Sequence, residues 1–106
     1  MSAVFEAINN PTRRRILDLL LDHPHSVGDL VEAMDISQPG VSKQLRQLRE
    51  AGLVKVRQEA QRRWYYLNAD PLQEVDEWLQ DYRKHWEENL DRLEDYLRQL
   101  QKEQFE

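Results

Sequence analysis

The chain of 106 residues contains no cysteine. This absence excludes disulfide bonds, thiolate metal ligands, thiol nucleophiles and thiol redox sensing. The sequence also lacks an apolar run long enough to span a membrane, and residues 1–25 lack the charged start, apolar stretch and cleavage site of a signal peptide. We therefore expect a cytoplasmic protein with no membrane contact.

Glycine and proline are scarce, with three and four residues respectively, and they fall at the expected boundaries of helices and strands. There is no repeat and no low-complexity linker. A chain of this length can bury one hydrophobic core but not two independent ones. We expect a single domain over residues 1–106, in which residues 70–106 form a long C-terminal dimerisation helix.

Positive charge is in the minority overall, since the net charge is -5. Residues 37–69 nevertheless hold seven basic and two acidic side chains, a local charge of +5. Residues 70–106 hold twelve acidic and five basic side chains, a local charge of -7. Because a binding surface responds to local charge, the acidic C-terminal segment does not exclude a nucleic-acid partner for the basic one.

Two helices are predicted in the first 22 residues. Val4, Phe5 and Ile8 are at helical spacing and predict a short helix over residues 2–9. Asn10 before Pro11 is typical of a helix start, because asparagine caps the helix and proline has no N–H to leave unpaired. The second helix should therefore run over residues 11–22. Its expected buried side chains are Ile16, Leu17, Leu20 and Leu21.

Two more helices follow. Ser26 should cap the third, with Asp29 as an imperfect partner in a capping box, where glutamate or glutamine is usual. Ser37 should cap the fourth, which ends near Ala51 before Gly52. Val41, Leu45 and Leu48 form the apolar face of this fourth helix. Its polar face carries Gln38, Ser42, Lys43, Arg46 and Arg49.

A β-hairpin is predicted next, because residues 53–59 and 62–68 are rich in β-favouring side chains and flank a tip at Ala60-Gln61. Asp70-Pro71 should then open the last helix in the same way as Asn10-Pro11 opens the second. The expected fold is mainly α with a small β-hairpin, in the order four helices, two strands and one helix. This order is typical of a winged helix-turn-helix protein.

In winged helix-turn-helix proteins the second helix of the pair enters the major groove of DNA. Gln38 can pair bidentately with adenine, Lys43 can donate to guanine, and Ser42 can adapt to either. Arg46 and Arg49 lie further along the helix and should meet phosphates, which position the protein rather than specify the sequence.

The hairpin adds a second group of polar and cationic side chains, suited to phosphates or the minor groove. They are Arg57, Gln61, Arg62 and Arg63. Their clustering next to a polar-faced helix, within an acidic chain, favours a contact surface for double-stranded DNA over a merely solvated surface.

Three motifs resemble the ArsR (SmtB-like) family of bacterial repressors: AINNPTRRRIL over residues 7–17, ISQPGVSKQL over 36–45 and LREAGLV over 48–54. The resemblance implies a homodimer, built on the first and last helices, that represses transcription from an inverted-repeat operator until an inducer, here unknown, releases it. It also implies which residues contact DNA. The helix positions are Gln38, Ser42, Lys43 and Gln44, and the wing positions are Arg57, Arg62 and Arg63.

The sequence departs from the family pattern at two positions. Gly40 replaces a bulkier residue inside the fourth helix, which should cost about 0.5–1 kcal/mol of helix stability relative to alanine. The tip Ala60-Gln61 lacks the glycine that is usual at the end of the wing.

Metal sensing in the family uses a cysteine pair in the third helix or a set of carboxylates and histidines in the last. The first site is absent here. For the second, His85 and Glu88 have the right spacing, but Leu72 and Glu74 stand where the partner ligands belong. His23 and His25 also lack metal partners, so we expect no metal and no cofactor.

The last helix carries more apolar surface than one small domain can cover, with leucine or tryptophan at every seventh residue from Leu72 to Leu100. A second copy of the chain would supply the missing surface, and a ligand pocket lined by Trp78, Tyr82 and Trp86 between paired helices is a further hypothesis. The residues expected at the dimer interface are Val4, Phe5, Leu79, Tyr82, Trp86, Leu90, Leu93, Leu97 and Leu100.

No arrangement of nucleophile and base and no phosphate-binding loop can be assembled from the sequence, so an enzyme is not expected. The alternative to a DNA-binding regulator is a protein interaction module. In that module the winged helix would bind another protein, and the acidic helix would mediate assembly in the manner of a coiled coil.

Overall fold

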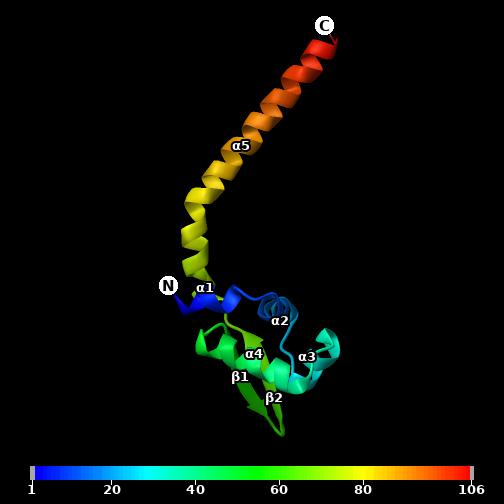
Figure 1. The fold of residues 1–106 in the computed structure, drawn as a ribbon, viewed down its shortest axis with the longest axis vertical. Helices are drawn as coiled ribbons and strands as arrows, with labels where there is room; N and C mark the ends of the chain where they lie inside the picture. The colour runs from blue at the N-terminus through cyan, green and yellow to red at the C-terminus, as the bar shows by residue number, and fades with distance from the viewer. Residues whose placement is uncertain (1, 106) are drawn as a thin grey trace. The chain divides into compact units, whose positions relative to one another are not determined.

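The computed structural model describes residues 2–105, and side chains as far as residue 103. The chain divides into two compact units, one ending at Val75 and the other beginning at Asp76, and each is described by itself. No helix in the described range is long and apolar enough to cross a membrane. The elements are α1 (Ala3–Ile8), α2 (Pro11–Asp22), α3 (Val27–Met34), α4 (Gln38–Glu50), β1 (Val54–Glu59), β2 (Arg62–Leu67), a 3₁₀ turn η1 (Asp70–Leu72) and α5 (Gln73–Phe105), as Figure 1 shows.

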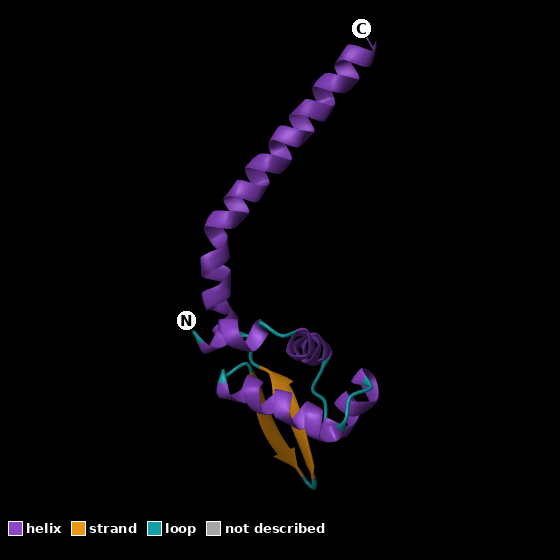
Figure 2. Cartoon of the chain, viewed as in Figure 1, coloured by secondary structure: helices purple, strands orange, loops and turns teal. Residues whose placement is uncertain are grey.

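The first unit packs four helices and one hairpin around a single core (Figure 2). Ile16 of α2, Leu30 of α3 and Val41 of α4 are fully buried at its centre. The element order confirms the predicted fold class of four helices, a hairpin and a last helix. Whether the two units act as one domain stays a prediction.

One predicted core residue is wrong. Leu21 was expected on the buried face of α2, but it is 74% exposed. The buried face of α2 centres on Leu20, with Ile16 and Leu17 on either side. Leu21 lies about 100° around the helix from Leu20 and is therefore beyond the edge of the core.

Arginines from α2 bind the end of α1, where carbonyl groups of the last turn can accept further hydrogen bonds. Arg13 Nη2 donates to the carbonyl of Glu6 at 3.0 Å, and Arg13 Nε donates to that of Ala7 at 2.6 Å. Arg14 Nη1 donates to the carbonyl of Ile8 at 2.7 Å. The start of α2 therefore holds the end of α1 through charge-assisted hydrogen bonds.

The predicted caps are confirmed. Asn10 Oδ1 accepts from the backbone N–H of Arg13 at 3.0 Å, and Ser37 Oγ accepts from that of Gly40 at 3.2 Å. The capping box of α3 forms in spite of its shorter aspartate: Asp29 N–H donates to Ser26 Oγ at 3.1 Å, and Ser26 N–H donates to Asp29 Oδ2 at 3.2 Å. The backbone hydrogen bond from Ser26 holds the pKa of Asp29 below its usual value of 3.8.

The structure explains why a glycine stands at position 40, which the sequence did not reveal. A Cβ atom at this position would lie 2.9 Å from Ile36 Cγ2 and 3.1 Å from Ser37 Oγ, which is the capping atom of α4. The missing side chain therefore lets the chain before α4 fold back onto its first turn. Gly52 ends α4 as predicted, with a φ of 78° that suits glycine.

The hairpin confirms the predicted strands and tip. Val54 pairs with Leu67 at its base and Glu59 with Arg62 at its end, so that Ala60 and Gln61 form the turn. The segment before α3 also forms an isolated β-bridge with β2, which the sequence analysis missed. His25 exchanges two backbone hydrogen bonds with Tyr65, of 3.0 and 2.8 Å, and is only 7% exposed.

The predicted start of the last helix is wrong in detail. Asp70 does not act as an N-cap like Asn10, because it lies inside the 3₁₀ turn that precedes α5. The residue before this turn is Ala69, whose carbonyl accepts from the N–H of Leu72 at 2.8 Å, and no side chain caps it. Because the hydrogen bonds of this turn join residues i and i+3, the turn already includes Asp70, and Ala69 takes the cap position.

Replacing each helical glycine by alanine should separate the effect of helix propensity from the effect of steric contacts made by the new Cβ atom. Gly28→Ala should stabilise the protein by about 0.5–1 kcal/mol, because its Cβ would meet only Ser26 Oγ at 3.8 Å. Gly40→Ala should give no such gain, because the Cβ would press on Ile36 and Ser37. Urea unfolding of both variants measures the difference, and an equal gain at both sites would contradict the packing role of Gly40.

The capping box should make stability depend on pH. Since the pKa of Asp29 is lowered by folding, its charged form stabilises the folded chain at pH values above 3.8, and this contribution is lost as the pH falls through the lower folded value. Asp29→Asn should therefore lower the melting temperature at pH 7, and the gap to the wild type should shrink as the pH falls below 3.8. Glu32→Gln on the same helix is the control, and a gap for Asp29→Asn that widens as the pH falls would refute this account.

Candidate nucleic-acid interface

The position of α4 is fixed by its apolar stripe. Val41, Leu45 and Leu48 are at most 2% exposed and lie in the core. Because successive residues of a helix are about 100° apart, the residues on the side opposite this stripe project away from the core. The predicted DNA-contacting residues Gln38, Ser42, Lys43, Arg46 and Arg49 are all exposed.

The hairpin presents the other predicted residues. Arg57, Gln61, Arg62 and Arg63 are exposed. The guanidinium carbon of Arg62 lies 5.6 Å from the centre of the Trp64 ring, a cation–π contact that limits where this charge can move. Arg57 Nη2 lies 3.2 Å from Glu59 Oε1, an exposed ion pair that is weak enough to exchange for a phosphate.

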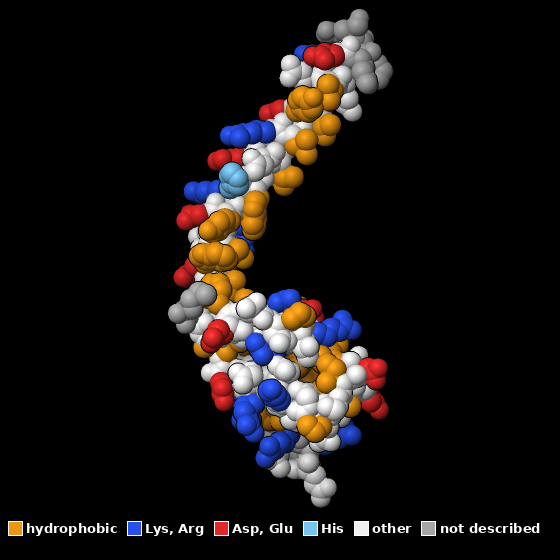
Figure 3. Space-filling model, in the orientation of Figure 1, with side chains coloured by type: hydrophobic (Ala, Val, Ile, Leu, Met, Phe, Trp, Pro, Cys, Tyr) orange, Lys and Arg blue, Asp and Glu red, His pale blue; other side chains and the backbone are white. Residues whose placement is uncertain are grey.

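A cavity of about 540 Å³ lies between α4 and β1. Its cations are Arg46 and Arg49 from α4 and Lys55 from β1, and its apolar part includes Val54 and Val56. Figure 3 shows Lys and Arg side chains gathered on this unit. Lys55 was not among the predicted contact residues, although its alternation with Val54 and Val56 already pointed it outward.

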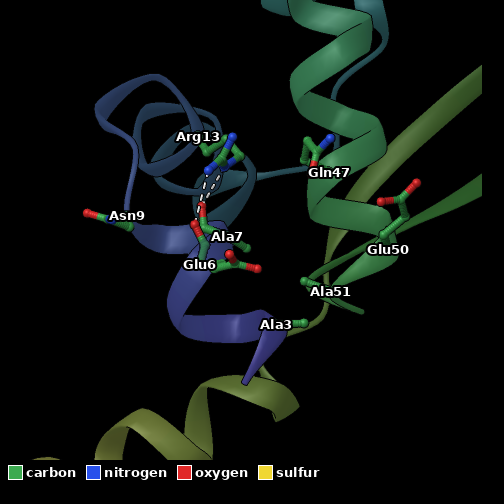
Figure 4. Close-up of a pocket in the computed structure, with 8 residues that line it drawn as sticks. All are labelled: Ala3, Glu6, Ala7, Asn9, Arg13, Gln47, Glu50 and Ala51. Atoms are coloured by element: carbon green, nitrogen blue, oxygen red, sulfur yellow. Dashed lines mark hydrogen bonds between the residues drawn. The ribbon is translucent and has the colours of Figure 1, made fainter. Parts of the chain in front are cut away.

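Gln44 differs from the other predicted contact residues. It is half-buried, and its Oε1 accepts a hydrogen bond of 3.0 Å from Arg13 Nη1 on α2. Arg13 also lines a second cavity, of about 390 Å³, between α1 and α4 (Figure 4). Its guanidinium group therefore bridges the two helices.

The second unit is the helix α5 from Asp76 onward, whose apolar side chains follow one side in Figure 3. Large hydrophobic side chains between 39% and 64% exposed include Tyr82, Trp86, Leu90, Leu93, Leu97 and Leu100. The other side carries ion pairs such as Arg83–Asp76 and Arg98–Glu94. The helix thus has an apolar stripe that nothing within this unit covers.

The predicted dimer residues in α1 need revision. Val4 is only 6% exposed and lies in the core of its own chain, so it offers almost no surface to a second copy. Phe5 is half-buried, and Leu79 of α5 is half-buried as well. The interface prediction therefore keeps Phe5 and the α5 residues but not Val4.

No group of three or more histidine, cysteine or acidic residues able to hold a metal ion occurs in the described part of the chain. Of the candidate pair, His85 Nε2 lies 3.2 Å from Asn89 Nδ2. His23 and His25 stack with ring centres 4.1 Å apart, and His25 Nδ1 contacts the carbonyl of His23 at 2.7 Å. Both histidines near Pro24 therefore have structural contacts.

The helices α3 and α4, followed by the β1–β2 hairpin, define the winged helix-turn-helix class of DNA-binding proteins. Residues 10–56 match the family model described as "Bacterial regulatory protein, arsR family". The chain is 38% identical to the transcriptional repressor SdpR of Bacillus subtilis over 82 residues, which cover 77% of this chain and 91% of SdpR. The chain belongs to the ArsR family of bacterial regulators, as its three motifs suggested.

Two further relatives agree. The transcriptional activator HlyU of Vibrio cholerae is 38% identical over 72% of this chain and 70% of its own length. The solved structure of reduced HlyU matches with a TM-score of 0.63 at 36% identity, covering 76% of this chain and 84% of HlyU. An ArsR-like regulator from Rhodococcus sp. RHA1 shares the fold, with a TM-score of 0.72 at 23% identity over 92% of this chain and 89% of its own. The protein is thus a transcriptional regulator and not an enzyme.

The tip of the wing should respond to a single glycine. Ala60 has a φ of 54°, in the left-handed region that costs a residue with a Cβ roughly 1–2 kcal/mol. Ala60→Gly should therefore raise the free energy of unfolding by about 1 kcal/mol, measured by urea denaturation. Gln61→Gly is the control, because Gln61 has no positive φ and glycine there should give no gain. A loss of stability in Ala60→Gly would contradict this reading of the turn.

Proposed function

We propose that the protein is a homodimeric repressor that binds an inverted-repeat operator, with one α4 helix of each copy in the major groove. The wing, about residues 53–68, would lie on the adjacent backbone or in the minor groove. The observation that carries the proposal is the cationic cavity between α4 and β1, which adjoins the exposed polar face of α4.

The polar face of α4 suits base recognition. An α-helix with its side chains is about 10–12 Å wide and fits the major groove, which is about 12 Å wide. Gln38 and Ser42 lie four residues apart on one side of the helix, and Lys43 lies next to Ser42. These side chains can donate to and accept from base edges, which is the chemistry that distinguishes one base pair from another.

The cavity between α4 and β1 suits the DNA backbone. Arg46, Arg49 and Lys55 come from two elements and surround one space large enough for a phosphate group. Because each neutralised phosphate releases counterions, binding there should weaken steeply as salt rises. Glu50 is the acidic side chain that lines the same cavity. Glu59 forms its ion pair with Arg57, and this pair would open on contact with DNA.

The homodimer is supported by the apolar stripe of α5. Two copies of the stripe would cover each other, and each exposed leucine that is buried contributes about 1.5–3 kcal/mol at full burial. An inverted-repeat operator follows from a two-fold dimer, because each half-site then meets one α4 helix.

Repression follows if the dimer competes with the transcription machinery for the operator. SdpR is named a repressor and HlyU an activator, so repression rather than activation is part of what we propose. The inducer is not identified, and with no cysteine in the chain its signal is not a thiol reaction. Since its proposed ligand is the bacterial chromosome, we expect the protein in the cytoplasm.

The second candidate function is a protein interaction module. The exposed stripe of α5 favours it as an assembly element, but the clustered cations of α4 and the hairpin favour DNA. If the affinity of the protein for a DNA fragment stayed the same between 50 and 200 mM salt, the interaction module would be favoured. Binding through several phosphate contacts should weaken roughly a thousand-fold or more over such a range.

Two substitutions should separate sequence reading from backbone contact. Lys43→Ala should reduce discrimination between operator and random DNA by about 1–3 kcal/mol, because it removes a donor to base edges. Arg62→Ala should weaken binding to both DNAs by the same factor and lower the slope of log affinity against log salt by about one. Fluorescence anisotropy titrations measure both quantities. If the two variants behave alike, the assigned roles are wrong.

Charges placed in the apolar stripe should break the dimer. Leu93→Glu with Leu97→Glu should yield monomers in sedimentation experiments, because two buried carboxylates would have no partners. Gln80→Glu with Gln99→Glu adds the same charge outside the stripe and should leave the dimer intact. A stable dimer of the Leu93 and Leu97 variant would refute the proposed interface.

A further inference from the structure

One guanidinium group connects the first helix with the DNA-reading helix. Arg13 donates from Nε to the carbonyl of Ala7 at 2.6 Å and from Nη2 to that of Glu6 at 3.0 Å. Its third nitrogen, Nη1, donates to Gln44 Oε1 of α4 at 3.0 Å. Figure 4 shows the two bonds to α1, with the guanidinium group between α1 and α4. All three nitrogens are therefore in use, which fixes the plane of the group.

Gln44 does not lie on the face of α4 that the other contact residues share. It is two residues from both Ser42 and Arg46, so it lies about 200° around the helix from each of them. It is half-buried, whereas Ser42 and Arg46 are exposed. Bidentate reading of adenine needs both the oxygen and the nitrogen of the amide, and this oxygen is already bonded to Arg13.

We propose that Gln44 is a positioning residue that acts on DNA through Arg13, and that it does not read a base. The Arg13–Gln44 bond fixes the rotation of α4 about its axis relative to α1 and α2. That rotation decides where Gln38, Ser42 and Lys43 meet the base edges. The inference rests on the proposed function, because it concerns how α4 is held while it reads the operator.

The charge and the partial burial of the pair give the bond its effect. A hydrogen bond to a charged donor is stronger than a neutral one, and screening by water is reduced at half-buried atoms. The apolar stripe of α4 resists large movements, but a small rotation would suffice to misplace a bidentate contact. A lysine at position 13 could not supply three donors in one plane.

The experiment compares four variants with the wild type: Arg13→Lys, Gln44→Ala, the double variant and Gln44→Glu. For each one, the preferred sequence is selected from random DNA, and the ratio of operator to random affinity is measured. Thermal melting establishes the folded fraction. Arg14→Lys is the matched control, because Arg14 binds the α1 carbonyl of Ile8 and, within residues 2–103, forms no hydrogen bond to α4.

Arg13→Lys and Gln44→Ala should each lower the affinity ratio about three- to ten-fold, as expected for one hydrogen bond. The double variant should lose no more than the larger of the two single losses, because the bond between the two side chains can be lost only once. Gln44→Glu should keep the wild-type base preference and ratio, since its carboxylate accepts from Arg13 while its charge weakens binding to all DNA alike. Arg14→Lys should keep the ratio as well.

Three results would overturn the inference alone. A new preferred base at one operator position in Gln44→Glu would make Gln44 a base reader. Losses that multiply in the double variant would mean that the two residues act independently. If both single variants lost the same affinity for operator and for random DNA, the bond would contribute to packing in general and not to sequence reading. A wild-type protein with no sequence preference would instead overturn the proposed function, and the inference with it.

Discussion

The interface depends on the burial of one apolar stripe of α4. Val41, Leu45 and Leu48 lie in a core that α2, α3 and the hairpin also line. Because protein interiors are close-packed, a large rotation of this stripe would open a cavity, so the opposite face of α4 is held outward. The three buried residues thus decide which face of the helix is exposed.

The end of α4 is linked to the hairpin by short local interactions. Gly52 turns the chain after α4. Asn68, the residue after β2, contacts this turn, because its Nδ2 donates to the carbonyl of Gly52 at 2.8 Å. This closure brings Lys55 beside Arg46 and Arg49. Arg46 and Arg49 of the helix and Lys55 of the wing therefore line one surface, although a turn separates them in the sequence.

Charge is divided between the two units in a way that suits their proposed tasks. The first unit contains the basic segment 37–69, and the second contains most of the acidic segment 70–106. A negative helix repels phosphates, so DNA would approach the basic surface rather than α5. The exposed apolar stripe of α5 serves a different contact, for which a second copy of the chain is the proposed occupant.

Sequence alone determined the features whose physical cause is local. Caps at Asn10, Ser26 and Ser37 join atoms three residues apart, and the strands follow from alternation along the chain, so both were predicted correctly. Periodicity does not specify where the edge of a core or a tighter turn falls. The predictions that depended on this were wrong, namely those for Leu21, Val4 and Asp70.

Only the tertiary structure decided the contacts between distant residues. His25 joins the hairpin through Tyr65, Gly40 leaves room for Ile36, and Arg13 reaches Gln44 across 31 positions of sequence. Such pairs have no signature in spacing or composition, because their geometry exists only after the helices have packed. The sequence thus determined that α4 carries a polar face, and the packing decided which of its side chains face outward and which one is held by Arg13.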